Sequence, residues 1–75
     1  MVNIARINKY APEGSTVVVP GKVLAIGDLD HKVNVAAWSF SENARRKIQE
    51  AGGRVLTIRE IMAENPSGKD LILMG

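Results

Sequence analysis

The stretch VVVPGKVLAIGDLDHKVNVAAWSFS, residues 17–41, contains most of the valines of the chain, together with its only histidine and its only tryptophan. Valine favours strands because its branched Cβ packs well on a pleated surface. Pro20 and Gly21 interrupt the apolar run, and this pair suits the centre of a type II turn. We therefore expect two short strands, residues 16–19 and 22–26, joined by a turn.

The polar residues 28–31 predict a loop, and residues 32–38 after it predict a third strand. Successive side chains of a strand point to opposite faces. One face is expected to carry Val33, Val35 and Ala37, and the other Lys32, Asn34, Ala36 and Trp38. For Trp38 this alternation leaves two interpretations open, contact with a partner and partial burial at the start of the next helix.

Helical signals flank this central stretch. The spacing of Ile4, Ile7 and Ala11 predicts one or two helical turns within residues 2–10. A second helix is expected to begin at Ser39 or Ser41, either of which can act as the N-cap, and to run through residue 51.

The remainder of the chain predicts a brief strand, a third helix and a closing strand. Residues 54–56 form the brief strand, and Thr57 with Glu60 has the spacing of a capping box that starts the helix. The inward side chains of that helix are expected to be Ile58, Ile61 and Met62. The closing strand, residues 70–74, is apolar enough to be covered on both sides.

These elements predict an α/β fold, a small domain with a mixed sheet of short strands and two main helices. An internal echo, GKVLAI at 21–26 and GRVLTI at 53–58, suits a domain built from irregular repeats with right-handed crossovers.

The composition indicates one small domain with an aliphatic core, because 45% of the 75 residues are hydrophobic and only 4% aromatic. The absence of cysteine excludes disulfides and thiolate metal sites. No apolar run approaches the length needed to cross a bilayer, and the first residues do not resemble an export signal. We therefore expect a cytoplasmic protein without membrane contact.

Asp28, Asp30 and His31 form the only cluster of residue types that bind metals or catalyse reactions. Neighbours in one loop rarely converge on one ion, and no second cluster completes a ligand shell. The sequence Pro20-Gly21-Lys22 lacks the spaced glycines and the following Ser or Thr of a phosphate-binding loop. We expect no enzyme, no metal, no cofactor and no small-molecule substrate.

Ten Lys and Arg residues against eight Asp and Glu residues give a net charge of +2. Affinity for RNA grows with the number of phosphates neutralised, so this chain can bind RNA tightly only if its cations share a face. Such cations would contact phosphates according to the shape of the RNA, without recognising its bases. The alternative is that these cations form an ordinary solvated surface. The candidate RNA-binding residues are Arg6, Lys9, Lys22, His31, Lys32, Arg45, Arg46, Lys47 and Arg54.

Several motifs resemble those of one family, in the same order and at matching spacing. They are PGKVL at 20–24, LDHKV at 29–33, VAA at 35–37, FS at 40–41, AxxKI at 44–48, AGG at 51–53 and LTI at 56–58. With VNIARI at 2–7, they closely resemble the eighteen-e protein of the archaeal and eukaryotic large ribosomal subunit, nearer its archaeal form. The bacterial large-subunit protein fifteen is a relative of that family. By this resemblance, the cations that match the family position by position are Arg6, Lys22, His31, Lys32 and Lys47. Positions at which the family is often basic are occupied by Arg45, Arg46 and Arg54.

The resemblance implies an α/β domain described as an irregular ββα superhelix, without catalysis. It also implies binding to large-subunit ribosomal RNA beside neighbouring ribosomal proteins, in the cytoplasmic ribosome.

The chain also departs from the family. Family members carry a further N-terminal segment rich in Lys and Arg, so residues 1–75 are expected to be a single globular domain truncated at its N-terminus. Ser67 and Asp70 replace a Lys and a Gly of the family's turn. The alternative function is a self-associating module, a homodimer with little RNA affinity, because removal of a covering segment exposes apolar surface.

Overall fold

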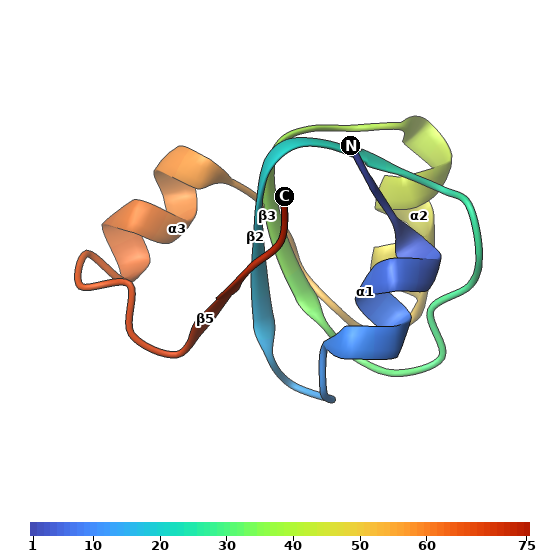
Figure 1. Ribbon diagram of the computed structural model, residues 1–75, viewed down its shortest axis with the longest axis horizontal. Helices are drawn as coiled ribbons and strands as arrows, with labels where there is room; N and C mark the ends of the chain where they lie inside the picture. The colour runs from blue at the N-terminus through green and yellow to red at the C-terminus, as the bar shows by residue number, and fades with distance from the viewer.

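The computed structural model describes residues Met1–Gly75, which form five strands and three helices (Figure 1). In chain order these are β1 (Val2–Asn3), α1 (Ile4–Tyr10), β2 (Thr16–Leu24), β3 (Asn34–Phe40), α2 (Glu42–Glu50), β4 (Val55–Thr57), α3 (Ile58–Glu64) and β5 (Leu71–Leu73). The α/β class predicted from the sequence is confirmed. The first helix forms after the two-residue strand β1, inside the segment expected to be helical.

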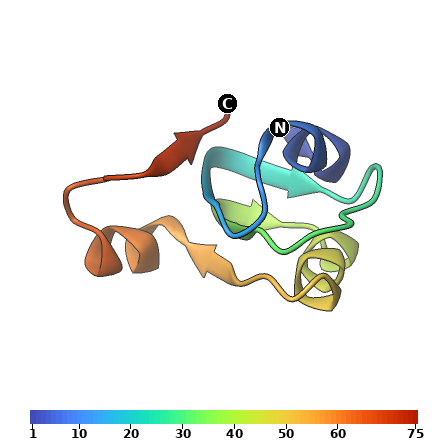
Figure 2. The same cartoon turned by 90° about the horizontal axis from the view of Figure 1, so that it is seen from below.

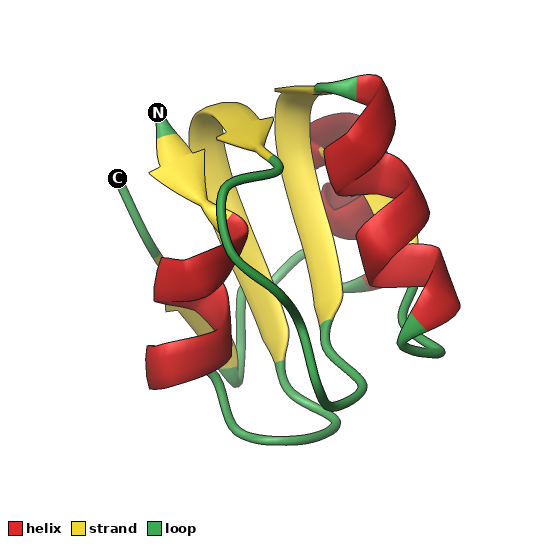
Figure 3. Cartoon of the chain, turned by 90° about the vertical axis from the view of Figure 1, so that its right-hand side faces the viewer, coloured by secondary structure: helices red, strands yellow, loops and turns green.

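Strand β2 organises the sheet, with β3 on one edge and β1 and β5 sharing the other. Strand β4 pairs with the far edge of β3. All these pairings are parallel, so the sheet is not the mixed one expected. The physical reason is that each of β2, β3 and β4 is followed by a crossover, through the loop of residues 25–33, α2 and α3 respectively. Figure 3 shows that loop crossing the sheet between α1 and α2.

The expected turn at Pro20-Gly21 is wrong, because both residues lie inside the continuous strand β2. Val19 pairs with Ala37, and Lys22 pairs with Ser39. Between these two pairs, β2 advances by three residues and β3 by only two. One extra residue on one strand is a β-bulge, which bends the strand and increases its twist. The bulge turns the last part of β2 sharply at one end of the sheet, as Figure 1 shows.

Helices α1 and α2 cover one face of the sheet, and α3 lies on the opposite face (Figures 1 and 2). The larger core lies beneath α1 and α2, and the smaller one beneath α3 contains Ala36, Leu56 and Ile61. The alternation predicted for the third strand is confirmed, since Val33, Val35 and Ala37 belong to the larger core and Ala36 to the smaller. The larger core comprises Val2, Ile4, Ile7, Ala11, Val17, Val19, Val23, Val33, Val35, Ala37, Ala44, Ile48 and Met74.

The helix starts agree with the capping signals. Ser41 is the N-cap of α2, because its Oγ accepts a hydrogen bond from the backbone N–H of Ala44 (3.2 Å), and Ser39 lies within β3. At α3 the capping box is confirmed: Thr57 Oγ1 accepts from the N–H of Glu60 (3.0 Å), and Glu60 Oε1 accepts from the N–H of Thr57 (2.7 Å). No helix has the length and apolar character needed to cross a membrane.

Two apolar side chains predicted to be covered are exposed. Met62 is 42% exposed, and Leu73 of the closing strand is 74% exposed. The cause is the short helix α3, which has seven residues and buries only Ile61 fully. A helix this short covers part of its side of the sheet and leaves the end of β5 open.

Candidate nucleic-acid interface

His31 is held inside the fold by both ring nitrogens. Nδ1 lies 2.8 Å from Asp30 Oδ1, and Nε2 lies 2.6 Å from the carbonyl oxygen of Ala11. Because both partners only accept hydrogen bonds, the pair is satisfied when both nitrogens carry protons. These bonds, first the one to Asp30 and then the one to Ala11, raise the pKa of His31. His31 therefore fastens the loop after β2 to the end of α1.

Lys47 likewise faces inward, although the sequence suggested a cation available to RNA. Its Nζ donates to the carbonyl oxygens of Ala25 (2.9 Å) and Gly27 (2.6 Å) and lies 3.5 Å from a carboxylate oxygen of Asp28. These bonds satisfy backbone oxygens that no strand or helix uses. Lys47 thus ties the same loop to α2.

Arg54 is paired within the chain. Its two terminal nitrogens donate to both carboxylate oxygens of Glu64, at 3.1 and 2.8 Å, which lowers the pKa of Glu64. This bidentate pair joins the residue before β4 to the last turn of α3. Phosphate contact by Arg54 would compete with the carboxylate of Glu64.

The three side chains of the Asp28, Asp30 and His31 cluster turn to different partners. Asp28 faces Lys47, while Asp30 accepts from His31, and this bond lowers the pKa of Asp30. The structure contains no group of three or more His, Asp or Glu side chains arranged to hold a metal ion.

The other six candidates point outward from the surface. The side chains of Lys22, Lys32 and Arg46 are exposed and make no hydrogen bond or ion pair within the chain. Arg45 lies over the ring of Phe40 at 5.7 Å, and Lys9 over the ring of Tyr10 at 5.3 Å. Arg6, also exposed, donates to the carbonyl oxygen of Gly75 (3.2 Å). Among the nine candidates, these six side chains are the ones that the fold leaves accessible to phosphate.

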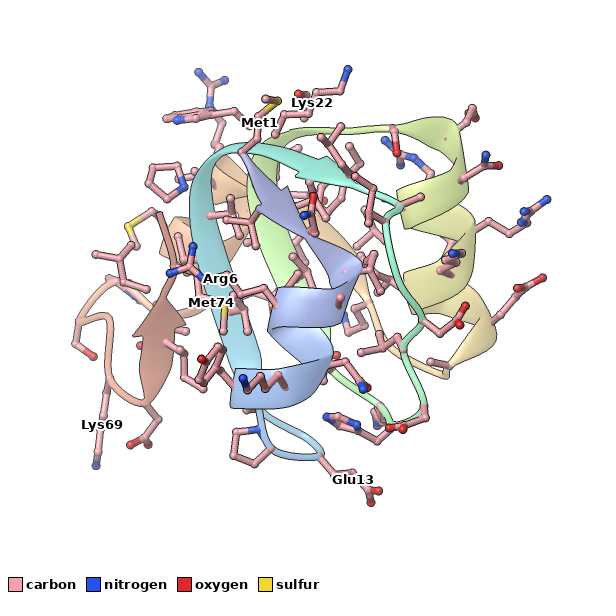
Figure 4. The ribbon with its side chains drawn as sticks, turned by 45° about the vertical axis from the view of Figure 1, so that its right-hand side comes forward. Met1, Arg6, Glu13, Lys22, Lys69 and Met74 are labelled. Atoms are coloured by element: carbon pink, nitrogen blue, oxygen red, sulfur yellow. The ribbon has the colours of Figure 1, made fainter.

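Sequence reasoning missed two further exposed cations, Arg59 and Lys69, whose side chains also lack a partner within the chain. Neither belongs to a motif, and only a plain count of Lys and Arg would have found them. Figure 4 shows that Lys22 lies at one end of the molecule, beside Met1, and Lys69 at the other, with Arg6 between them. These three cations are thus spread along the molecule from one end to the other.

The structure tests one of the two interpretations of Trp38, partial burial at the start of α2. Its side chain is 67% exposed, so it is not buried at the start of α2. A large exposed aromatic ring on a strand is available for contact with a partner.

Comparison with known proteins identifies the family. The family model described as ribosomal protein 60S L18 and 50S L18e matches residues 1–75. The large ribosomal subunit protein eL18 of Methanothermobacter thermautotrophicus is 54% identical over 70 residues, which cover 93% of this chain and 58% of that protein. The protein of the same name from Methanococcus maripaludis is 49% identical over 73 residues, covering 97% of this chain and 61% of that protein.

The corresponding protein of Methanosphaerula palustris is 55% identical over 67 residues, covering 89% of this chain and 55% of that protein. The chain thus spans between 55% and 61% of the length of these curated relatives. The resemblance inferred from the motifs, including its archaeal character, is confirmed. This chain belongs to the family of ribosomal proteins 60S L18 and 50S L18e.

Proposed function

We propose that this chain acts as a structural part of the large ribosomal subunit, binding ribosomal RNA through phosphates and shape. In this role it performs no catalysis, contacts neighbouring ribosomal proteins and resides in the cytoplasmic ribosome. The observation that carries the proposal is the match of the family model over residues 1–75, together with relatives whose names place them in the large subunit.

The contacts within the chain divide the nine candidate residues into two groups. Three of them are bonded within the chain: His31 to Asp30 and Ala11, Lys47 to Ala25 and Gly27, and Arg54 to Glu64. Their first role is therefore to hold the fold. The phosphate contacts then belong to Arg6, Lys9, Lys22, Lys32, Arg45 and Arg46.

Binding to large-subunit ribosomal RNA, measured across a series of salt concentrations, tests the proposal. Each phosphate contact contributes about 0.7–0.9 to the slope of log affinity against log salt, because it releases a condensed counterion. Lys32→Gln and Arg46→Gln should each weaken binding and lower that slope by about one. Lys69→Gln is the matched control, since Lys69 is also exposed but lies outside the proposed set. Affinity that is undetectable at low salt, or that does not change with salt, refutes phosphate contact.

Self-association is the second candidate function, and the exposed apolar side chains favour it. Leu73 and Trp38 are 74% and 67% exposed, and the alternation along their strands places both on the sheet face that α3 covers only in part. A second copy covering this face would form a homodimer. Sedimentation at several protein concentrations separates the two cases, and a monomer at every concentration rules the homodimer out.

The expected basic segment before Met1 stays a prediction. The family resemblance supports it, and the coding sequence upstream of Met1 tests it directly. An in-frame extension rich in Lys and Arg is the expected result.

A further inference from the structure

A crevice lies at the carboxyl ends of β3 and β4. These neighbours pair over Val35–Ala37 and Val55–Thr57, but the chain leaves β3 toward α2 on one face and leaves β4 toward α3 on the other (Figures 1 and 2). Parallel sheets bind ligands at such points, where connections diverge to opposite faces and open a gap between strand ends. A pocket opens here, lined by residues of both strand ends and both helices, among them Trp38, Phe40, Arg45, Thr57 and Glu60.

Trp38 forms an exposed wall of this crevice. Strand β3 continues for three residues beyond Ala37, whereas β4 ends at Thr57 opposite Ala37, so no strand flanks Trp38 on that edge. The indole N–H has no acceptor within the chain, and the ring is 67% exposed. A rigid strand therefore presents an aromatic surface to the solvent beside a hollow.

The charges around the crevice select what can enter it. The carboxylate of Glu60 lines the pocket and accepts from the N–H of Thr57, so a phosphate inside would meet a negative charge. A cation lies at the rim, because Arg45 is among the residues that line the pocket. An uncharged planar ring suits the interior, and a phosphate linked to that ring through a sugar suits the rim.

We propose that Trp38 stacks against an unpaired base of RNA, while Arg45 contacts the adjoining phosphate. The inference rests on the proposed RNA-binding function and adds a base contact to its phosphate contacts. The base must be unpaired, because a paired base within a helix is stacked on both sides and cannot reach the ring. A second copy of this chain fits the rim less well, since it brings the same positive net charge.

The emission of Trp38 provides a direct measurement, because it is the only tryptophan of the chain. The probes are two RNA hairpins with the same stem, one fully paired and one with a single bulged adenosine. Only the bulged hairpin should quench the emission of the 75-residue chain. Trp38→Ala should bind the bulged hairpin roughly 5- to 150-fold more weakly and the paired hairpin unchanged, since stacking contributes to each unpaired base alone.

Two further variants serve as controls for the interpretation that Trp38 stacks on a base. Trp38→Phe keeps an aromatic face and should recover most of the affinity for the bulged hairpin, which a merely misfolded protein would not. Tyr10→Ala removes another exposed aromatic ring, on α1 and outside the crevice, and should leave both affinities unchanged.

The outcomes separate the inference from the proposed function. If both hairpins bind and Trp38→Ala weakens neither, stacking is overturned while RNA binding stands. If neither hairpin binds at low salt, both are overturned. Emission that changes with protein concentration alone, and not with RNA, assigns the crevice to a second copy and overturns the stacking.

Discussion

The ring of His31 donates a hydrogen bond of 2.6 Å from Nε2 to the carbonyl oxygen of Ala11, the residue that ends α1. Through this bond, a side chain twenty positions later in the sequence fixes where the first helix stops relative to the sheet. Only the imidazolium can donate to both Asp30 and Ala11, because neutral imidazole keeps a single N–H, so this pair of contacts depends on pH.

Stability should fall on the alkaline side of neutral pH. The pKa of His31 is raised above its ordinary value of 6.5, so the folded protein holds this proton more tightly than the unfolded chain does. The stabilisation is fully present below pH 6.5 and is lost as the pH rises through the raised pKa. We expect the Tm to fall over this range, and His31→Gln to lack that fall. The proton resonances of the single histidine report the pKa directly.

The pKa of Asp30, the partner of His31, is shifted in the opposite direction. Its pKa is lowered below the ordinary value of 3.8, so its contribution to stability is present above pH 3.8 and is lost in stronger acid.

Tm curves of His31→Gln and the parent that remain parallel from about pH 6 to about pH 9 would show that His31 is not coupled to folding.

Lys47→Met should destabilise the protein by about 1–3 kcal/mol, because the carbonyl oxygens of Ala25 and Gly27 lose their donor. Arg46→Met is the matched control on the same helix, since Arg46 is exposed and unpaired, and should change stability by less than about 0.5 kcal/mol. Urea denaturation of both variants measures the difference. Equal stability of the two would mean that water replaces Lys47 at the loop.

Gly27→Ala should destabilise the protein by more than about 2 kcal/mol. Gly27 has a φ of +93°, and a Cβ there would overlap the Cβ of Ala5 and lie 2.8 Å from its Cα. Gly14→Ala is the control, because Gly14 has a similar φ of +81° but open space around it. It should show only the backbone strain of about 1–2 kcal/mol. Thermal unfolding compares the two, and a Gly27 variant no less stable than the Gly14 variant would refute close packing of α1 on the loop.

Ser41→Ala should cost about 0.5–2 kcal/mol, because the first turn of α2 loses the acceptor for the N–H of Ala44. Ser39→Ala should have almost no effect, since Ser39 is exposed and its hydroxyl makes no hydrogen bond within the chain. Chemical denaturation distinguishes the two serines. The reverse order of effects would place the N-cap at Ser39.

Local signals predicted most of the elements, whereas long-range pairing decided the details. Ile4 with Ile7 and Thr57 with Glu60 act within one or two turns, so the sequence alone revealed α1 and the start of α3. Pro20-Gly21 is compatible with both a turn and a bulge. The choice depends on β3 lying alongside both halves of β2, and no local pattern contains that information.

The candidate residues show the same limit. The sequence identified His31, Lys47 and Arg54 as cations, but apart from Asp30 beside His31 their acceptors lie ten to twenty-two positions away along the chain. Only the folded chain shows that these three are engaged while Lys22, Lys32 and Arg46 are free. Exposure of Leu73 was equally inaccessible, because it follows from how little of the sheet α3 covers.

The shared edge of β2 has a consequence for the order of folding. Thr16–Val18 on this edge pair with Leu71–Leu73, while Val23 and Leu24 further along it pair with β1. During synthesis from the N-terminus, the first half of that edge remains unpaired until Leu71–Leu73 have been made. Unpaired edges of nascent sheets are sites of aggregation. The nascent chain is therefore most vulnerable just before its last strand emerges, and completion of β5 ends that vulnerability.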